Sequence, residues 1–238
     1  MNERVWPKLL HVLVIVALPL ALLASSFRLT TGHWLVRWEY HKADFPADPY
    51  GLSTAERIRL AQVCVDYLIS GAGIELLEEL RLEDGQPAFN ERELQHMIDT
   101  KRVLWTVLRL GWAMGLIVVG SVAALASRPQ TRRRAPLALW QGGLSGLGLL
   151  AAVGLVMVLR WDFFFDSFHE LLFPPDTWTF YYSDTLIRLY PVRFWMDVAI
   201  VVVSLFALQS AAVVGGAGLW YRQAQRARDK AQGTRHDM

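Results

Sequence analysis

Two of the six histidines have an acidic residue three positions away: His96 precedes Asp99, and His169 follows Asp166. On a helix, residues three apart share a face, so each carboxylate could fix the tautomer of its imidazole and raise its basicity. This pattern predicts general acid and base chemistry by the two histidines. Asp99, Asp166 and the neighbouring Glu170 are the expected supporting acids. The alternative is a pair of ordinary solvated histidines.

The motifs of well-known hydrolases are incomplete in this chain. HELLF (residues 169–173) begins like the zinc-protease pattern H-E-x-x-H, but Phe173 stands where the second histidine would be. GLSGL (residues 143–147) lacks the closing glycine of a G-x-S-x-G nucleophile elbow. A metal bound by the two histidines would need a third ligand, such as Glu170, Asp99 or Glu93, and no metal-site spacing is present. We therefore expect no metal and no cofactor.

The elements that position these residues are membrane helices. The chain is 53% hydrophobic and 19% charged, and long apolar runs cover residues 9–27, 103–126, 137–159 and 198–220. Each run reaches or approaches the roughly 20 residues that cross a bilayer. This predicts an all-α, polytopic protein in which residues 1–238 form a single membrane domain with four spans. The first run could instead be a cleaved signal peptide, although its apolar core is long for one.

The distribution of Lys and Arg predicts the orientation. Segments 1–8, 127–136 and 221–238 carry eleven of these residues in 36 positions, whereas segments 28–102 and 160–193 carry twelve in 109. Because Lys and Arg are concentrated on the cytoplasmic side, both termini and the 127–136 loop are predicted to be cytoplasmic. His96 and His169 then face outward. His11 and His236 fall near the cytoplasmic side, and His33 and His41 fall in predicted loop sequence, so these four are weaker candidates. Nothing in the charge pattern suggests nucleic acid binding.

The loop 28–102 has its own helix signals. Ser53 and Glu56 have capping-box form before a segment of helical apolar spacing. Asn90 and Glu93 form a second box, and no helix breaker follows before Ala126. We therefore expect one continuous helix, with His96 about two turns, roughly 10 Å, before the apolar run.

The loop 160–193 is unusually aromatic, since the stretch from Trp161 to Trp195 holds thirteen of the 28 aromatic residues. Trp and Tyr favour the headgroup level of a membrane. We expect an interfacial helix at 162–173, followed by an irregular aromatic hairpin. The side chains that could line the entry path of an amphiphile are Trp178, Tyr181, Tyr182, Arg188 and Arg193. Arg109, inside the second span, could pair with an acid or a lipid.

Three stretches resemble a known family: WEYHKADFPADPYGLSTAER, ELQHMIDTK and FHELLFPPDTWTFYYSDTLIRLYPVRFW. Together with the four spans, they are similar to the bacterial membrane family that includes the lipoprotein intramolecular transacylases. The resemblance implies acyl migration on the outer face of the plasma membrane. An ester-linked acyl chain of a diacylglyceryl-cysteine lipoprotein would move to its free α-amino group, leaving a lyso-form lipoprotein. By their motifs, His96 and His169 match the two functional histidines of the family.

Two alternatives remain open at the level of sequence. One is a non-enzymatic membrane protein that binds lipids or lipoproteins. The other is a related enzyme that acts on free glycerolipids. The expected partners are therefore a diacylated lipoprotein and membrane lipids.

Overall fold

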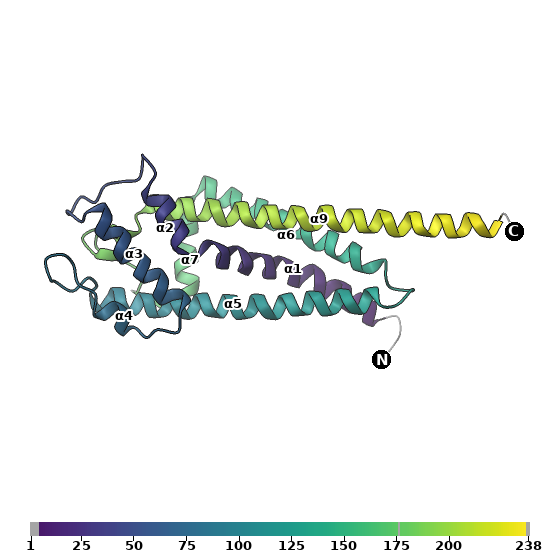
Figure 1. Cartoon of the computed structure of the whole chain (residues 1–238), viewed down its shortest axis with the longest axis horizontal. Coiled ribbons are helices and arrows are strands. Elements are labelled where there is room, and N and C mark those ends of the chain that lie inside the picture. Colours follow the sequence, from purple (N-terminus) through teal and green to yellow (C-terminus); the bar gives the residue numbers. More distant parts are fainter. Residues whose placement is uncertain (1–4, 176, 237–238) are drawn as a thin grey trace. The chain divides into compact units, whose positions relative to one another are not determined.

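A computed structural model describes residues 5–175 and 177–236, with side chains up to residue 226 (Figure 1). Long and short helices make up most of this part of the chain, joined by turns and one isolated β-bridge between Arg81 and Pro87. The helices are α1 (Trp6–Thr30), α2 (His33–Tyr40), α3 (Thr54–Ile69), α4 (Glu75–Glu78), α5 (Glu91–Ala126), α6 (Arg134–Leu159), α7 (Trp161–Leu172), α8 (Thr185–Leu189) and α9 (Val192–His236). The all-α prediction is confirmed.

Four of the helices are long and apolar enough to cross a membrane: α1, α5, α6 and α9. Each contains one of the four runs found in the sequence, so the chain is a multi-pass membrane protein. Its contacts divide it into two compact units. The bundle unit comprises residues 1–26, 109–155 and 203–238, and the site unit comprises residues 27–108 and 156–202. The organisation as a single membrane domain stays a prediction.

Glycines allow close helix contacts in the bundle unit. A side chain at Gly142 would meet the backbone of α1, and one at Gly143 would meet the backbone of α9. Gly111 likewise leaves room for Ala24. Small residues let helix backbones approach closely in lipid, where packing replaces the hydrophobic effect. The glycine-rich stretch in α6 therefore lies where α6 packs closely against α1 and α9.

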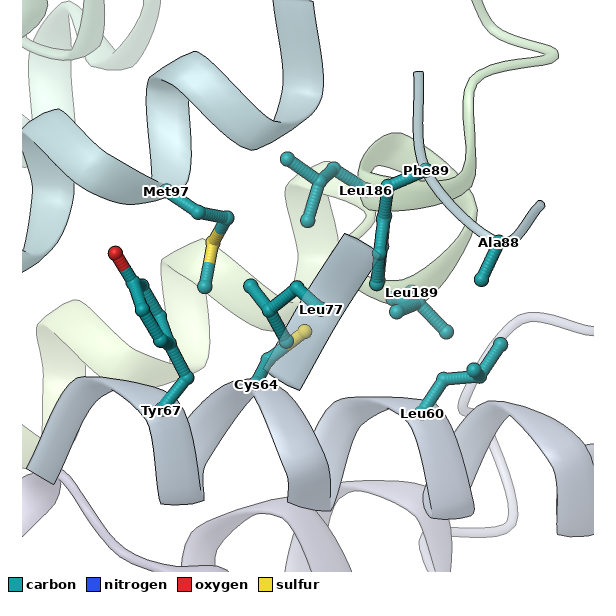
Figure 2. Packing of buried hydrophobic residues seen from close by; sticks show 9 residues of the cluster. All are labelled: Leu60, Cys64, Tyr67, Leu77, Ala88, Phe89, Met97, Leu186 and Leu189. Carbon is teal, nitrogen blue, oxygen red and sulfur yellow. The ribbon is translucent and has the colours of Figure 1, made fainter. Parts of the chain in front are cut away.

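The core of the site unit joins α3, α4, α5 and α8. Figure 2 shows Met97 of α5 pointing toward Tyr67 of α3 and Leu77 of α4, with Leu186 and Leu189 of α8 beside Phe89. Cys64 lies in the same cluster and is fully buried. Removing its thiolate from water raises the pKa of Cys64 to about 12, so this thiol is chemically inert.

The start of α5 follows the predicted capping box. The Asn90 side chain accepts from the Glu93 backbone N–H (3.1 Å), and the Glu93 carboxylate accepts from the Asn90 backbone N–H (2.8 Å). Glu93 also accepts from the backbone N–H of Leu186, which ties α8 to α5. Glu93 is almost fully buried, and this desolvation raises its pKa. The helix then runs without interruption to Ala126, as expected.

Two local predictions need correction, and one amphipathic stretch forms little helix. Ser53 caps α3 as expected, but the Glu56 carboxylate accepts from the Glu83 backbone N–H instead of reaching back to Ser53. The segment that contains His33 is the helix α2 rather than a loop, and its Leu35 and Val36 are buried. The amphipathic stretch near residues 74–82 forms only the short α4.

Candidate active site

The structure brings His96 of α5 and His169 of α7 together within the site unit. Their ring centroids lie 6.4 Å apart, with the planes inclined by 24°. The two histidines are 73 positions apart in the sequence, so only the fold of the site unit makes them neighbours. Two imidazoles at this spacing could contact one small group of a substrate placed between them.

Aromatic side chains enclose the histidine pair. Phe173 lies against both rings, at 4.8 Å from His96 and 5.5 Å from His169 between centroids. The ring of Phe180 meets His96 nearly edge-on at 5.2 Å, and Trp178 stacks on His169 at 5.0 Å. The remaining contacts of His169 come from its own helix, through Phe165 and Phe168. We call these five aromatic residues the aromatic cage.

One tautomer of His169 is fixed by its backbone contact. Its Nδ1 lies 2.7 Å from the carbonyl oxygen of Phe165. A carbonyl oxygen can only accept, so Nδ1 carries the hydrogen, and in the neutral ring Nε2 holds the free lone pair. Burial lowers the pKa of His169, against the opposing effects of the Phe165 carbonyl and Asp166. His169 is therefore a neutral proton acceptor at neutral pH.

His96 lies in the charged first turns of α5, before the apolar part of that helix begins at Val103. Burial, with a smaller effect from nearby His169, lowers its pKa to about 4. The negative charge of Asp99 and, to a smaller extent, a hydrogen bond to the backbone of Thr177 oppose this lowering of the pKa. In the described part of the chain, the Nδ1 atom of His96 is buried and has no hydrogen-bond partner. This ring nitrogen is available to a substrate.

The acids that led us to the two histidines do not bond them. Asp99 is buried, and its carboxylate accepts from Arg102 (2.6 Å) and Gln95 (3.2 Å). Asp166 and Glu170 are exposed. The backbone carbonyl of Phe165 orients His169 in place of a carboxylate. Spacing in the sequence identified the pair but not the groups that hold it.

The other predicted site residues have varied surroundings. Arg188 forms a nearly buried ion pair with Asp48 (2.9 Å), and Arg193 pairs with Asp44 and Asp197. Tyr181 and Tyr182 are exposed. Arg109 belongs to the bundle unit. The functional roles of these residues, and of Trp178, stay predictions.

The predicted aromatic hairpin contains a segment that contacts the pair, although Thr177, Phe180 and Asp184 in this segment are not among the predicted site residues. Residues 177–184, here called the aromatic strap, contribute Thr177, Trp178 and Phe180 to the two rings. The Asp184 carboxylate anchors the strap to α5 by accepting from Arg92 (2.8 Å) and Asn90 (3.1 Å). Nothing in the sequence links Asp184 to residues more than 90 positions away. Its aromatic composition was the available signal.

The metal alternative needs a third ligand beside the two histidines. Within residues 5–175 and 177–236, no group of three His, Cys, Asp or Glu side chains could hold a metal ion. Glu93, one of the expected third ligands, instead accepts from two backbone N–H groups.

The helices and the pair define a class: a membrane-integral helical protein with two neutral imidazoles in an aromatic cage. The family model for "Lipoprotein intramolecular transacylase Lit" matches residues 12–195. This chain belongs to that family and is therefore an acyltransferase of the lipoprotein transacylase type. An uncharacterized protein of Aquifex aeolicus (strain VF5) is 33% identical over 190 residues, covering 80% of this chain and 84% of the relative.

Solved structures show the same fold. One structure of the membrane integral lipoprotein intramolecular transacylase Lit from Bacillus cereus has a TM-score of 0.74 at 19% identity. The match covers 93% of this chain and 94% of the Bacillus cereus chain. A second structure of Lit from Bacillus cereus has a TM-score of 0.72 at 21% identity, and the match covers 95% of this chain and 97% of that chain. The fold of this chain is thus shared over nearly its whole length.

Proposed function

We propose that this chain moves an ester-linked acyl chain of a diacylglyceryl-cysteine lipoprotein to the α-amino group of the same cysteine, with His96 and His169 as its catalytic residues. The product is an N-acylated lyso-form lipoprotein. The observation that carries this proposal is the pair of imidazoles, 6.4 Å apart, inside the aromatic cage. Membership of the transacylase family supplies the reaction class.

The two ring nitrogens that carry no hydrogen can both accept hydrogen bonds from an attacking amine. In the proposed complex, Nδ1 of His96 and Nε2 of His169 each accept one N–H of the neutral amine. The nitrogen lone pair is then directed at the ester carbonyl carbon. Because amine and ester belong to one substrate molecule, positioning supplies much of the acceleration, and no serine or cysteine nucleophile is needed.

The proton transfers balance within the substrate. A C–N bond forms as His169 takes a proton from the amine, whose ordinary pKa is about 8. The C–O bond to glycerol then breaks, and the imidazolium returns the proton to the glyceryl oxygen. One ester becomes one amide, one glyceryl hydroxyl appears, and nothing else is consumed.

We further propose that the reaction takes place on the outer face of a bacterial plasma membrane, with both termini in the cytoplasm. The density of Lys and Arg in segments 1–8, 127–136 and 221–238 supports this orientation. The aromatic composition of segment 160–193 supports a site at the membrane surface.

Mass spectrometry of a lipoprotein's N-terminal peptide tests the proposed function. The lipoprotein is isolated from a bacterial host that lacks other N-acylation of lipoproteins, with and without this chain. We expect the wild type to produce the N-acylated lyso form. His96→Ala and His169→Ala should each lower its amount by at least about 100-fold, because general base catalysis contributes 10²–10⁴-fold.

His41→Ala is the matched control, because His41 is exposed and its ring bonds only the nearby Arg37 carbonyl. It should leave the product unchanged. If both site variants retain wild-type product, the histidine mechanism is wrong. If the wild type leaves lipoproteins unmodified but changes the acyl composition of free glycerolipids, the substrate assignment is wrong.

A further inference from the structure

Three buried polar atoms without a hydrogen-bond partner lie along one face of α5. They are Nε of Arg92, Nδ1 of His96 and Oγ1 of Thr100. Residues four apart are neighbours on a helix surface, each step rising about 6 Å along the axis. We call this row the polar column. In the described part of the chain, the other three such atoms are on α1, α2 and α9, one on each.

Unpartnered atoms of this kind need an explanation, because buried polar groups in native proteins are nearly always hydrogen-bonded. Thr100 is the most informative of the three. A threonine hydroxyl inside a helix commonly bonds the carbonyl four residues back. Thr106 does so, with its hydroxyl 2.8 Å from the Arg102 carbonyl. In the described structure the buried hydroxyl of Thr100 makes no such bond, so its capacity to donate a hydrogen bond is unused.

The chemistry of the polar column limits what it can bind. The Nε–H of Arg92 is only a donor, and this guanidinium is held by Asp184 and lies over Tyr181. Nδ1 of His96 serves as an acceptor in the proposed complex, and the Thr100 hydroxyl can donate. A matching ligand therefore presents an acceptor, an N–H group and a second acceptor, about 6 Å apart.

We propose that the polar column binds the head of the lipoprotein substrate, and that Thr100 donates to the carbonyl of the ester that is not transferred. This inference rests on the proposed function. The two esters of a diacylglyceryl group stand on neighbouring glycerol carbons, so one carbonyl can lie one helical turn from the other. Thr100 is the member of the column nearest the apolar part of α5, where acyl chains belong. Arg92, at the opposite end, takes a carbonyl of the peptide.

Kinetics of Thr100→Val with a synthetic diacylglyceryl-cysteine peptide test this assignment. The substitution preserves shape and removes the hydroxyl. We expect kcat/KM to fall about three- to tenfold, the usual effect of losing one hydrogen bond. The melting temperature should not fall, because no internal hydrogen bond is lost. Thr100→Ser should restore the rate.

Thr106→Val is the matched control on the same helix, because its hydroxyl is exposed and bonded to its own backbone. Its activity should stay within twofold of the wild type. A second substrate carries an ether in place of the ester that the wild type leaves intact. For the wild type, kcat/KM should be three- to tenfold lower with this analogue than with the diester substrate. For Thr100→Val, kcat/KM should be the same with both substrates.

The outcomes separate the two proposals. If wild-type protein forms no N-acylated product from the synthetic peptide, the proposed function is wrong. If the wild type is active and Thr100→Val matches it within twofold, the role of Thr100 is wrong. If Thr100→Val lowers kcat/KM relative to the wild type by the same factor on both substrates, the proposed contact with the retained ester is also wrong.

Discussion

At the scale of single residues, the site consists of two imidazoles that burial keeps neutral. The pKa of His96 is lowered to about 4, with desolvation as the largest cause. Neither ring is held by a carboxylate, since Asp99 bonds Arg102 and Gln95, and Asp166 is exposed. Each ring is therefore neutral and has one nitrogen that can accept a proton.

This lowered pKa predicts how stability depends on pH. Between pH 6.5 and about 4, the unfolded chain binds a proton at His96 that the folded chain does not, so stability falls as the pH falls. The His96 contribution amounts to about 2–3 kcal/mol by pH 4. Between pH 7 and pH 4.5, we expect the free energy of unfolding of the wild type to fall by this amount more than that of His96→Phe.

Unfolding in detergent at several pH values measures this difference. His41→Phe controls for the loss of a histidine elsewhere, and it should follow the wild type. If the free energy of unfolding depends on pH in the same way for the wild type and His96→Phe, His96 is not desolvated.

Patterns in the sequence predict both histidines, but they do not predict the groups that hold the two rings. An acid three residues away pointed to each of them, yet in the described structure neither acid bonds its histidine. The actual partners are the Phe165 carbonyl, the Thr177 backbone and aromatic rings. Side-chain spacing cannot show which backbone carbonyl a ring meets, because that depends on rotamers set by packing.

At the scale of elements, the aromatic strap belongs to neither α5 nor α7, and it contributes Trp178 and Phe180 to the aromatic cage. Its anchor is one carboxylate, Asp184, which accepts from Arg92, Asn90 and the backbone N–H of Tyr181. The side chain of Asp184 is only 11% exposed, so these bonds are weakly screened. Loss of this anchor should free the strap while leaving α5 and α7 in place.

Asp184→Ala therefore has a local expected effect. Hydrogen exchange in residues 177–184 should become faster, and N-acylation should fall roughly tenfold, as for the loss of a charge-assisted bond. Exchange measured by mass spectrometry should change little in α3 and α6. Asp66→Ala, which removes an exposed carboxylate paired with His33, is the control. Unchanged protection of the strap would contradict its anchoring by Asp184.

Elements with strong local signals were predictable from the sequence. The spans follow from apolar length, and the start of α5 follows from the capping box of Asn90 and Glu93. Helix α2 was missed because it is only eight residues long and begins after Gly32, whose position offers no side-chain cap. The path of the strap depends on contacts between residues about 90 positions apart, which local patterns do not encode.

At the scale of the whole molecule, the described part of the chain has four helices that are long and apolar enough to cross a membrane, and its contacts form two compact units. The two histidines lie in the site unit, which contains the loops predicted to face outward. The basic segment near residues 127–136 belongs to the bundle unit. Topology therefore decides whether the chemistry takes place outside the cell.

Labelling of single cysteines tests this orientation. Tyr50→Cys and Tyr182→Cys introduce thiols at exposed positions of the predicted outer loops, and Arg132→Cys introduces one in the predicted cytoplasmic loop. The first two should react fully with a membrane-impermeant maleimide in intact cells, and the third only after lysis. The native Cys64 is buried and should not react, so the unmodified chain is the blank. Labelling of position 132 in intact cells would reverse the orientation.

In the described structure neither imidazole is hydrogen-bonded to a carboxylate, and this has a consequence for the fate of the acyl group in the proposed reaction. A histidine with an ionised partner keeps a permanent charge and the water that solvates it, and such water would compete with an amine for the ester. The aromatic cage instead surrounds two uncharged rings, so it is compatible with hydrocarbon. In the proposed mechanism it carries a charge only while His169 holds the proton of the amine. Exclusion of water favours transfer over hydrolysis, which a transacylase must avoid.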